Sequence, residues 1–348
     1  MGGVLVTVVC ITYNHENYIR NALDGFLSQK TDFQYKIVIH DDASTDNTQA
    51  IIREYAEKYP ELFVPILQEE NQYQAGIGIM RNYIQPLLEG EYFALCEGDD
   101  YWCAPDKLQE QVGFMKNHED YVACVHNTLR YDCRNNKSTL MYKKGKSRDI
   151  TLEDVIWRGG SAFHTSSLLA KKELFLIPNE IINRWFGDYS RAIYLTLSGK
   201  VRFLNKTMSV YRYFSQGSWT ANSFSEKDSN KAIMLDREKI DMLERCDKYW
   251  GGKYTDIFQE VIRAKEADIM FKQKKYRDIV SNKKYLRLFH KQYGLLRTCL
   301  LFARAVSCHE PPLPAAQRGH PLQTIWWRVR SRPEHYRPDD VLFTRRVA

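Results

Sequence analysis

Adjacent carboxylates after an apolar stretch are the residues of this sequence best suited to chemistry. Glu97, Asp99 and Asp100 follow the run Tyr92–Cys96, with Gly98 between the first two. Neighbouring carboxylates repel each other unless a cation or a hydrogen-bonding ligand compensates their charge. Oxygen-only ligation suits Mg²⁺ or Mn²⁺, which hold a diphosphate through one or two carboxylates and waters. The segment therefore predicts a divalent-cation site, with an acidic turn or a helix cap as the alternative.

A second acidic segment, Asp41–Asp46, follows the run Tyr35–His40 in the same way. Its Asp42 could accept hydrogen bonds from a nucleobase or a ribose, or it could cap the next helix. Ser44, Thr45 and Asp46 are residue types that favour a helix cap.

The elements that must position these segments alternate between strand and helix. The hydrophobic pattern predicts strands at 4–11, 35–40, 63–67 and 92–96, with helices near 18–27, 48–58 and 79–88. Right-handed crossovers then give a parallel sheet with helices on both faces. Ligands bind such sheets at the carboxyl edge of the strands, which is where Thr12–Asn14, Asp41–Asp46 and Glu97–Asp100 fall.

The rest of the chain changes in character. A helix is predicted at 105–116, a strand at 121–127, a variable polar insertion at 128–160, a strand at 162–170, a helix at 185–197 and a strand at 201–204. A helical region follows at about 226–306. After residue 309 the composition shifts to Pro, Arg and His, so 309–348 are interpreted as a disordered or foreign tail.

Charge is distributed unevenly. Residues 1–120 hold 8 Lys and Arg against 20 Asp and Glu, whereas residues 262–306 hold 12 against 3. The basic region suggests an anionic partner, and contact with a membrane surface through 262–306 is one hypothesis; a helical packing face is the other. Eight cysteines without a CxxC pair, and no apolar run of about 18 residues, favour a cytoplasmic protein without a spanning helix.

The order of the motifs resembles glycosyltransferase family 2, whose members have the GT-A fold. Val8–Asn14 is similar to the family's opening strand, and Ile39–Asp46 to its "DDGSTD" turn. Asn71–Asn82 resembles its glycine-and-arginine loop, and Gly90–Asp100 its DXD-like metal segment. The resemblance covers about residues 4–220. It implies a Rossmann-like, mostly parallel sheet flanked by helices, followed here by a mainly helical basic extension.

The resemblance also implies roles for individual residues. Thr12, Tyr13 and Asn14 would contact the nucleotide, Asp42 the base and Asp99 the ribose. Asp100 would hold the metal.

Two further roles follow from the same resemblance. Arg81 is similar to a basic residue near the nucleotide or diphosphate. Asp188 matches the family's general base, although Gly187 stands where an acidic residue is more usual.

Downstream, Val210–Arg212 resembles a family strand, and 216–219 a loop over the donor. Relatives carry a histidine shortly after that arginine, where this chain has Tyr213 and Phe214. His164 could face the acceptor instead, or it could be structural.

We therefore expect a GT-A domain at 1–222, divided into a nucleotide-sugar-binding part at 1–127 and an acceptor-binding part at 128–222, and a helical basic extension at 223–308. The expected activity is inverting, metal-dependent transfer from a nucleotide-sugar, with UDP-sugar favoured, to a glycan or lipid-linked glycan of surface polysaccharide or lipopolysaccharide. The alternatives are a sugar nucleotidyltransferase and a non-enzymatic protein that binds anionic surfaces. No nucleic-acid motif is present, so nucleic acid is not an expected partner.

Overall fold

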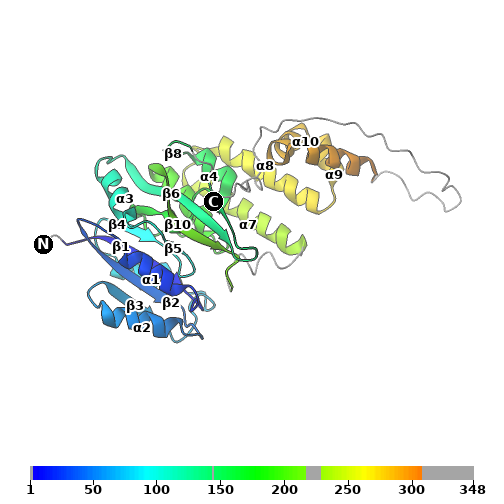
Figure 1. Cartoon of the computed structure of the whole chain (residues 1–348). Coiled ribbons are helices and arrows are strands. Elements are labelled where there is room, and N and C mark those ends of the chain that lie inside the picture. The colour runs from blue at the N-terminus through cyan, green and yellow to red at the C-terminus, as the bar shows by residue number, and fades with distance from the viewer. Residues whose placement is uncertain (1–2, 143–144, 217–228, 308–348) are drawn as a thin grey trace. The chain divides into compact units, whose positions relative to one another are not determined.

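The structure is a computed structural model, and it describes residues 3–142, 145–216 and 229–307. The described residues form two compact units, which divide between residues 227 and 228 (Figure 1). The tail predicted at 309–348 lies outside the described residues.

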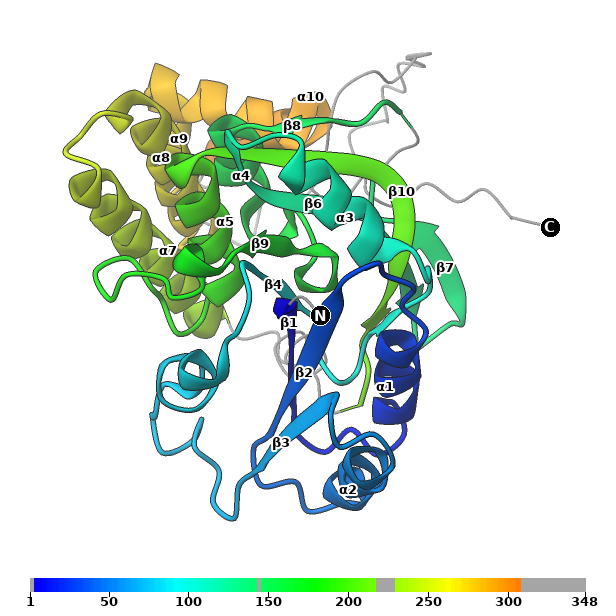
Figure 2. The same cartoon turned by 90° about the vertical axis from the view of Figure 1, so that its left-hand side faces the viewer.

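The first unit begins with the predicted alternation of strands and helices. Its strands are β1 (Val4–Thr12), β2 (Gln34–Asp41), β3 (Phe63–Leu67) and β4 (Tyr92–Leu95), and its first helices are α1 (Ile19–Leu27) and α2 (Thr48–Lys58). The four strands are parallel, as predicted, and their order in the sheet is β3-β2-β1-β4. Figure 2 shows α1 and α2 on one side of these strands and the chain between β3 and β4 on the other.

The core explains this layering. Val8 and Cys10 of β1 are fully buried and belong to one hydrophobic cluster with Leu23 and Phe26 of α1. Side chains alternate between the two faces of a strand, so Val9 and Ile11 face the opposite side. That second face of β1 lines the cavity described below.

The sheet continues beyond β4 with antiparallel and parallel pairs. The added elements are β5 (Tyr101–Trp102), α3 (Lys107–Lys116), β6 (Tyr121–Asp132), β7 (Lys137–Leu140), β8 (Arg148–Ile150), α4 (Leu152–Arg158), β9 (Leu169–Lys171), α5 (Gly187–Ser198) and β10 (Lys200–Tyr213). The strand order is β4-β9-β6-β10-β5, with β7 paired to β6 and β8 to β10. β6 and β10 are parallel, whereas β9 is antiparallel to both β4 and β6.

The prediction of a variable polar insertion at 128–160 is wrong. β6 continues to Asp132, and β7, β8 and α4 follow it as regular elements. The polar side chains of β6 misled the prediction because its partner strand satisfies them: Thr128 Oγ1 lies 3.0 Å from Ser209 Oγ of β10, and both residues are fully buried. Buried polar groups are tolerated once they are hydrogen-bonded.

Two other predicted elements differ. The helix expected near 79–88 is a π-helical turn at Met80–Ile84 followed by a 3₁₀ turn at Gln85–Leu87. Pro86 lacks the N–H that an α-helix needs at this point, which explains the irregularity. The strand expected at 162–170 is confined to β9, because a 3₁₀ turn occupies Thr165–Ser167.

The second unit is helical, as expected. It contains α7 (Ser229–Tyr249), α8 (Thr255–Lys272), α9 (Tyr276–Ser281) and α10 (Lys283–Ser307). Ile279, Phe289 and Leu301 form its buried cluster. None of the described helices has both the length and the hydropathy needed to cross a bilayer.

Candidate active site

The carboxylates predicted to bind a cation meet at the carboxyl edge of β4. Glu97, Asp99 and Asp100 each offer an oxygen atom, and these three atoms lie within 4.8 Å of one another. Asp99 and Asp100 are buried, with 8% and 1% exposure, whereas Glu97 is exposed. Two carboxylates of the cluster are therefore buried, and the third, that of Glu97, is reached by solvent.

Strand β10 holds two of these carboxylates in place. The backbone N–H of Arg212 donates to Asp100 Oδ1 at 2.9 Å, and the Arg212 guanidinium donates to the Asp99 carbonyl at 2.6 Å. Ser215 Oγ donates to Asp99 Oδ2 at 2.7 Å. The Arg212 guanidinium also lies 4.6 Å from the centre of the Tyr101 ring, so both its charge and its flat face are used.

One oxygen of the cluster has no hydrogen-bond partner among the residues that the structure describes. This atom is Asp100 Oδ2, which is buried. Burial, followed by the charges of Asp99 and Glu97, raises the pKa of Asp100 well above its usual range. The pKa of Glu97 is also raised, by desolvation and by the charges of Asp188 and Asp99. A divalent cation would supply the missing charge and the missing bond, so this oxygen-only donor set fits Mg²⁺ or Mn²⁺.

Gly98 permits the contact between this segment and the end of β1. A Cβ atom at Gly98 would lie 2.5 Å from Thr12 Oγ1 and 2.7 Å from Thr12 Cβ, which is closer than atoms can approach. Thr12 is buried, and its hydroxyl lies 3.1 Å from His15 Nδ1. The spacing Glu-Gly-Asp-Asp therefore has a steric reason as well as a chemical one.

The acidic segment after β2 makes internal hydrogen bonds. Asp42 Oδ1 and Oδ2 accept the backbone N–H groups of Gln72 (2.8 Å) and Tyr73 (3.1 Å), which holds the start of the loop between β3 and β4. Asp46 accepts the N–H of Thr48, the first residue of α2. The contact between Asp42 and a nucleobase stays a prediction.

The end of β1 is tied to the same segment. The Asn14 N–H donates to Ser44 Oγ, and Asn14 Oδ1 accepts the Thr45 N–H, both at 2.7 Å. Tyr13 between them is 39% exposed, so its ring is available to a ligand. The structure thus brings Thr12, Asn14 and the Asp41–Asp46 segment together.

Arg81 lies apart from these contacts. It sits exposed in the π-helical turn, and its guanidinium donates to Asn179 Oδ1 at 3.0 Å. Its role near a diphosphate stays a prediction.

Asp188 lies in the first turn of α5 and lines a cavity of about 170 Å³ together with Glu97. The apolar walls come from Val9, Ile11, Met80, Leu95, Ile177 and Ile182, and the polar lining includes Thr165 and Arg191. Thr165 Oγ1 donates to Asp188 Oδ1 at 3.2 Å. Asp188 as a whole is exposed, but desolvation of its carboxyl group raises the pKa of Asp188, while the Thr165 hydrogen bond and the Arg191 charge oppose the shift. The cavity thus joins the predicted base to the carboxylate cluster.

Sequence reasoning placed Glu97 in the acidic motif without a role of its own, and it assigned no role to Arg191. Glu97 belongs to the motif that was singled out, so its place in the site was within reach. Arg191 follows Asp188 by three residues on α5, and residues at this spacing share a helix face. Burial lowers the pKa of its guanidinium to about 10. Ser215 carried no sequence signal, because its partner Asp99 is far away in the chain.

His164 lies beside the cluster. Its Nδ1 is 3.6 Å from Asp100 Oδ2 and 2.8 Å from Ser166 Oγ, and its ring lies 4.1 Å from that of Tyr211. Burial lowers the pKa of His164 to about 4, so the ring is neutral at physiological pH.

The position where relatives carry a histidine is different here. Phe214 has a φ of 60° and lies under the Arg134 guanidinium, 3.6 Å from the ring centre. Of the loop predicted at 216–219, residues 217–219 lie outside the described residues.

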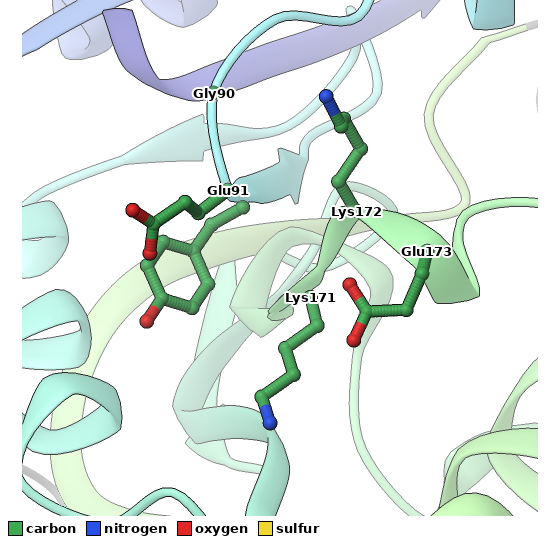
Figure 3. Close-up of a pocket in the computed structure, with 6 residues that line it drawn as sticks. Gly90, Glu91, Lys171, Lys172 and Glu173 are labelled. Carbon is green, nitrogen blue, oxygen red and sulfur yellow. The ribbon is translucent and has the colours of Figure 1, made fainter.

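A larger cavity of about 370 Å³ lies at the other end of β4 (Figure 3). Its lining includes Glu91, Lys171, Lys172 and Glu173, in which the charges balance. Figure 3 shows the two lysine side chains pointing away from each other. None of the predicted site residues lines this larger cavity, so the smaller cavity is the candidate active site.

Comparison with known proteins places this site in a family. Residues 7–176 match the model described as Glycosyl transferase family 2. The uncharacterized protein Rv1520 of Mycobacterium tuberculosis is 36% identical over 232 residues, which cover 62% of this chain and 60% of the relative. The chain therefore spans about three fifths of the length of this curated relative.

Two solved structures share the fold. Residues 1–349 of S. aureus TarS, in complex with UDP-GlcNAc, match with a TM-score of 0.53 at 17% identity, over 87% of this chain and 89% of that one. The mannosyltransferase PcManGT from Pyrobaculum calidifontis, in complex with GDP-Man and Mn²⁺, matches with a TM-score of 0.53 at 19% identity, over 87% and 79%. Residues 7–176 of the chain therefore form a glycosyltransferase family 2 domain, and the two solved structures show that the chain has the GT-A fold.

Proposed function

We propose that this protein transfers a sugar from a nucleotide diphosphate donor, with UDP-sugar favoured, to a hydroxyl group of a glycan or lipid-linked glycan, with inversion and with the help of Mn²⁺ or Mg²⁺. The observation that carries the proposal is the unpartnered Asp100 Oδ2, buried in a cluster of three carboxylates whose exposed member, Glu97, lines the same cavity as Asp188. The nucleotide-sugars bound in the TarS and PcManGT structures support it.

The carboxylate cluster would hold the cation and the nucleotide. Asp100 would bind the metal, Asp99 the ribose, and Thr12–Asn14 with Asp42 the rest of the nucleotide. A bound divalent cation stabilises the negative charge that develops on the leaving diphosphate. Arg212 and Ser215 are positioning residues. They hydrogen-bond to Asp99 and Asp100, and neither of them lines the cavity.

Asp188 would act as the general base. The acceptor oxygen attacks the anomeric carbon while its proton passes to the Asp188 carboxylate, and the bond from that carbon to the diphosphate breaks with its electron pair leaving on the nucleotide. One displacement inverts the configuration at the carbon. The raised pKa of Asp188 makes it a stronger base, and general-base catalysis contributes about 10²–10⁴-fold.

Glu97 would bind hydroxyl groups of the transferred sugar. Its carboxylate lies at the opening of the cluster and lines the cavity between the metal side and Asp188. A carboxylate with free lone pairs accepts hydrogen bonds from hydroxyl groups, which fits a sugar in this position. The apolar walls suit the C–H face of the ring.

We further propose that the protein works in the cytoplasm, at the inner face of the membrane, in the synthesis of surface polysaccharide or lipopolysaccharide. The acceptor would be lipid-linked or a growing glycan. The basic region 262–306 would provide a peripheral contact, since it combines an excess of positive charge with apolar side chains.

A panel of nucleotide-sugars tests the reaction. Thermal stabilisation of the protein by each donor with and without Mn²⁺ would identify the base and the metal, and incubation with a labelled UDP-sugar and candidate acceptors would identify the product. Release of UDP is expected. A nucleotidyltransferase would instead consume added pyrophosphate and convert the UDP-sugar into UTP and a sugar 1-phosphate. Salt-sensitive binding to DNA without any Mn²⁺-dependent nucleotide binding would indicate an anionic-surface binder.

A further inference from the structure

Helix α10 of the second unit presents an apolar face that its own core does not cover. The helix bends at Gly294, whose φ is 74°. Beyond the bend, Thr298, Leu301 and Ala305 are 0–8% exposed and face the unit's interior. Five large apolar side chains are instead 42–71% exposed: Leu295, Leu296, Leu300, Phe302 and Val306.

These exposed residues form one contiguous face. An α-helix turns by about 100° per residue, so the five side chains fall within an arc of about 160°, across the helix from the buried arc of Thr298, Leu301 and Ala305. The part of α10 before the bend is different, because Leu288 and Phe289 are buried there. Packing within the unit therefore accounts for Leu288 and Phe289 before Gly294, but not for the five exposed apolar residues after it.

The region around this face is strongly basic. Residues 269–307 contain ten Lys and Arg and one acidic residue, Asp278, which gives a net charge of +9. Arg297 and Arg304 are exposed, and by the same helical geometry both lie at one border of the apolar arc. The Arg297 guanidinium lies 5.1 Å from the centre of the Tyr293 ring of α10, and the Arg304 guanidinium lies 5.2 Å from the centre of the Phe271 ring of α8.

We propose that the face of α10 formed by Leu295, Leu296, Leu300, Phe302 and Val306 binds the surface of an anionic lipid bilayer, with its apolar side chains among the upper acyl chains and Arg297 and Arg304 at the headgroups. An apolar arc bordered by cationic side chains is the pattern of a helix that lies in the bilayer interface. The contact does not depend on the transfer reaction.

Charge decides between this partner and the two others available. A second copy of the chain that met this face with its own α10 would bring the same +9 segment against itself. Residues 308–348 of this chain contain seven Arg and four acidic residues, a net charge of +3, so they too would be repelled. Anionic lipid headgroups attract the segment, at about 1 kcal/mol for each Lys or Arg near the surface.

Flotation of the full-length protein with vesicles tests the proposal. We expect binding to vesicles of phosphatidylglycerol and phosphatidylcholine, and at least about tenfold weaker binding to phosphatidylcholine alone. Leu295→Ser combined with Leu296→Ser should weaken binding by about tenfold or more, because two large apolar side chains lose their lipid contact. Met234→Ser combined with Tyr249→Ser is the matched control, since these α7 residues are 40% and 46% exposed, and it should leave binding unchanged.

A spectroscopic reporter covers the case in which a variant changes the fold. Phe302→Trp places an indole on the proposed face, and its emission should shift to shorter wavelength when anionic vesicles are added. Absence of both vesicle binding and the shift would overturn the proposal. It would equally fail if the leucine variant bound vesicles like the parent while light scattering showed the loss of a dimer, or if removal of 308–348 were required before any vesicle bound.

Discussion

Two acidic segments follow β2 and β4, the strands on either side of β1, and the protein uses them in opposite ways. After β2, Asp41 accepts the Ser44 N–H at 2.9 Å and the Gln49 Nε2 at 2.8 Å, and Asp42 accepts two backbone N–H groups. After β4, Asp100 Oδ2 is buried without a partner, and the pKa values of Glu97 and Asp100 are both raised. Carboxylates of the first segment stabilise turns. Those of the second form the cluster that we propose binds a cation.

The comparison shows that residue type and position at a strand end do not by themselves mark a ligand site. An Asp that accepts several N–H groups is stabilised as an anion by the fold itself. An Asp whose buried oxygen has no hydrogen-bond partner destabilises the metal-free folded state. A ligand that binds this oxygen removes that cost. Each substitution below therefore has a different expected effect on stability and on transfer.

Replacement of Asp100 by Asn should have the largest effect. We expect kcat/KM for transfer to fall by about 10⁴-fold, because the amide cannot replace a metal-binding carboxylate. Binding of Mn²⁺, followed by the electron paramagnetic resonance of the ion, should be lost. Circular dichroism should show a folded protein, since Asn can still accept the Arg212 N–H.

The same variant carries a pH prediction for the protein in EDTA. The pKa of Asp100 is raised in the folded state, so its carboxyl favours folding at low pH, and that contribution is lost as the pH rises through the folded pKa. At pH 8 Asp100→Asn should therefore raise the free energy of unfolding, and at pH 4 it should do so by much less. A variant less stable than the parent at pH 8 would show that Oδ2 is satisfied in the metal-free protein.

Replacement of Asp188 by Asn should lower kcat by about 10³-fold and leave donor binding within about twofold. Calorimetry of UDP binding with Mn²⁺ separates the two quantities. Thr165→Val is the matched control, because it removes the hydrogen bond to Asp188 Oδ1 and keeps the carboxylate, and it should cost about tenfold or less. Full transfer by Asp188→Asn would remove Asp188 from the mechanism.

Replacement of Asp41 by Asn probes the other segment. The buried Asp41 carboxylate accepts from Ser44 and Gln49, and an amide would turn one of its oxygens into a donor that faces another donor. We expect the free energy of unfolding to fall by about 2–3 kcal/mol, measured by urea denaturation. Mn²⁺ binding by the folded fraction should persist. Equal stability of variant and parent would mean that the two segments do not differ as described.

Much of this comparison could be predicted from the sequence, since apolar runs followed by polar residues locate the parallel strands and their carboxyl edge. The different roles of the two acidic segments could not be predicted. The partners of Asp42 come from the loop after β3. Those of Asp99 and Asp100 come from β10 and from Ser215 just beyond it, more than a hundred residues later. The prediction for strand β6 ended too early for a related reason. Thr128 and Ser209 satisfy each other's hydrogen bonds only after their strands have paired.

The smallest effect concerns Ala43, which stands where the family's "DDGSTD" turn has glycine. Its φ is 62°, a left-handed conformation that costs a residue with a Cβ about 1–2 kcal/mol. Ala43→Gly should raise the free energy of unfolding by about 0.5–1 kcal/mol, after the greater entropy of glycine in the unfolded chain is counted. Ala50→Gly is the matched control, because Ala50 is exposed within α2 and the same change should destabilise by about 1 kcal/mol. If urea denaturation gave both substitutions the same sign, the turn would not be strained, and the acidic segment after β2 would owe its shape to Asp41 and Asp42 alone.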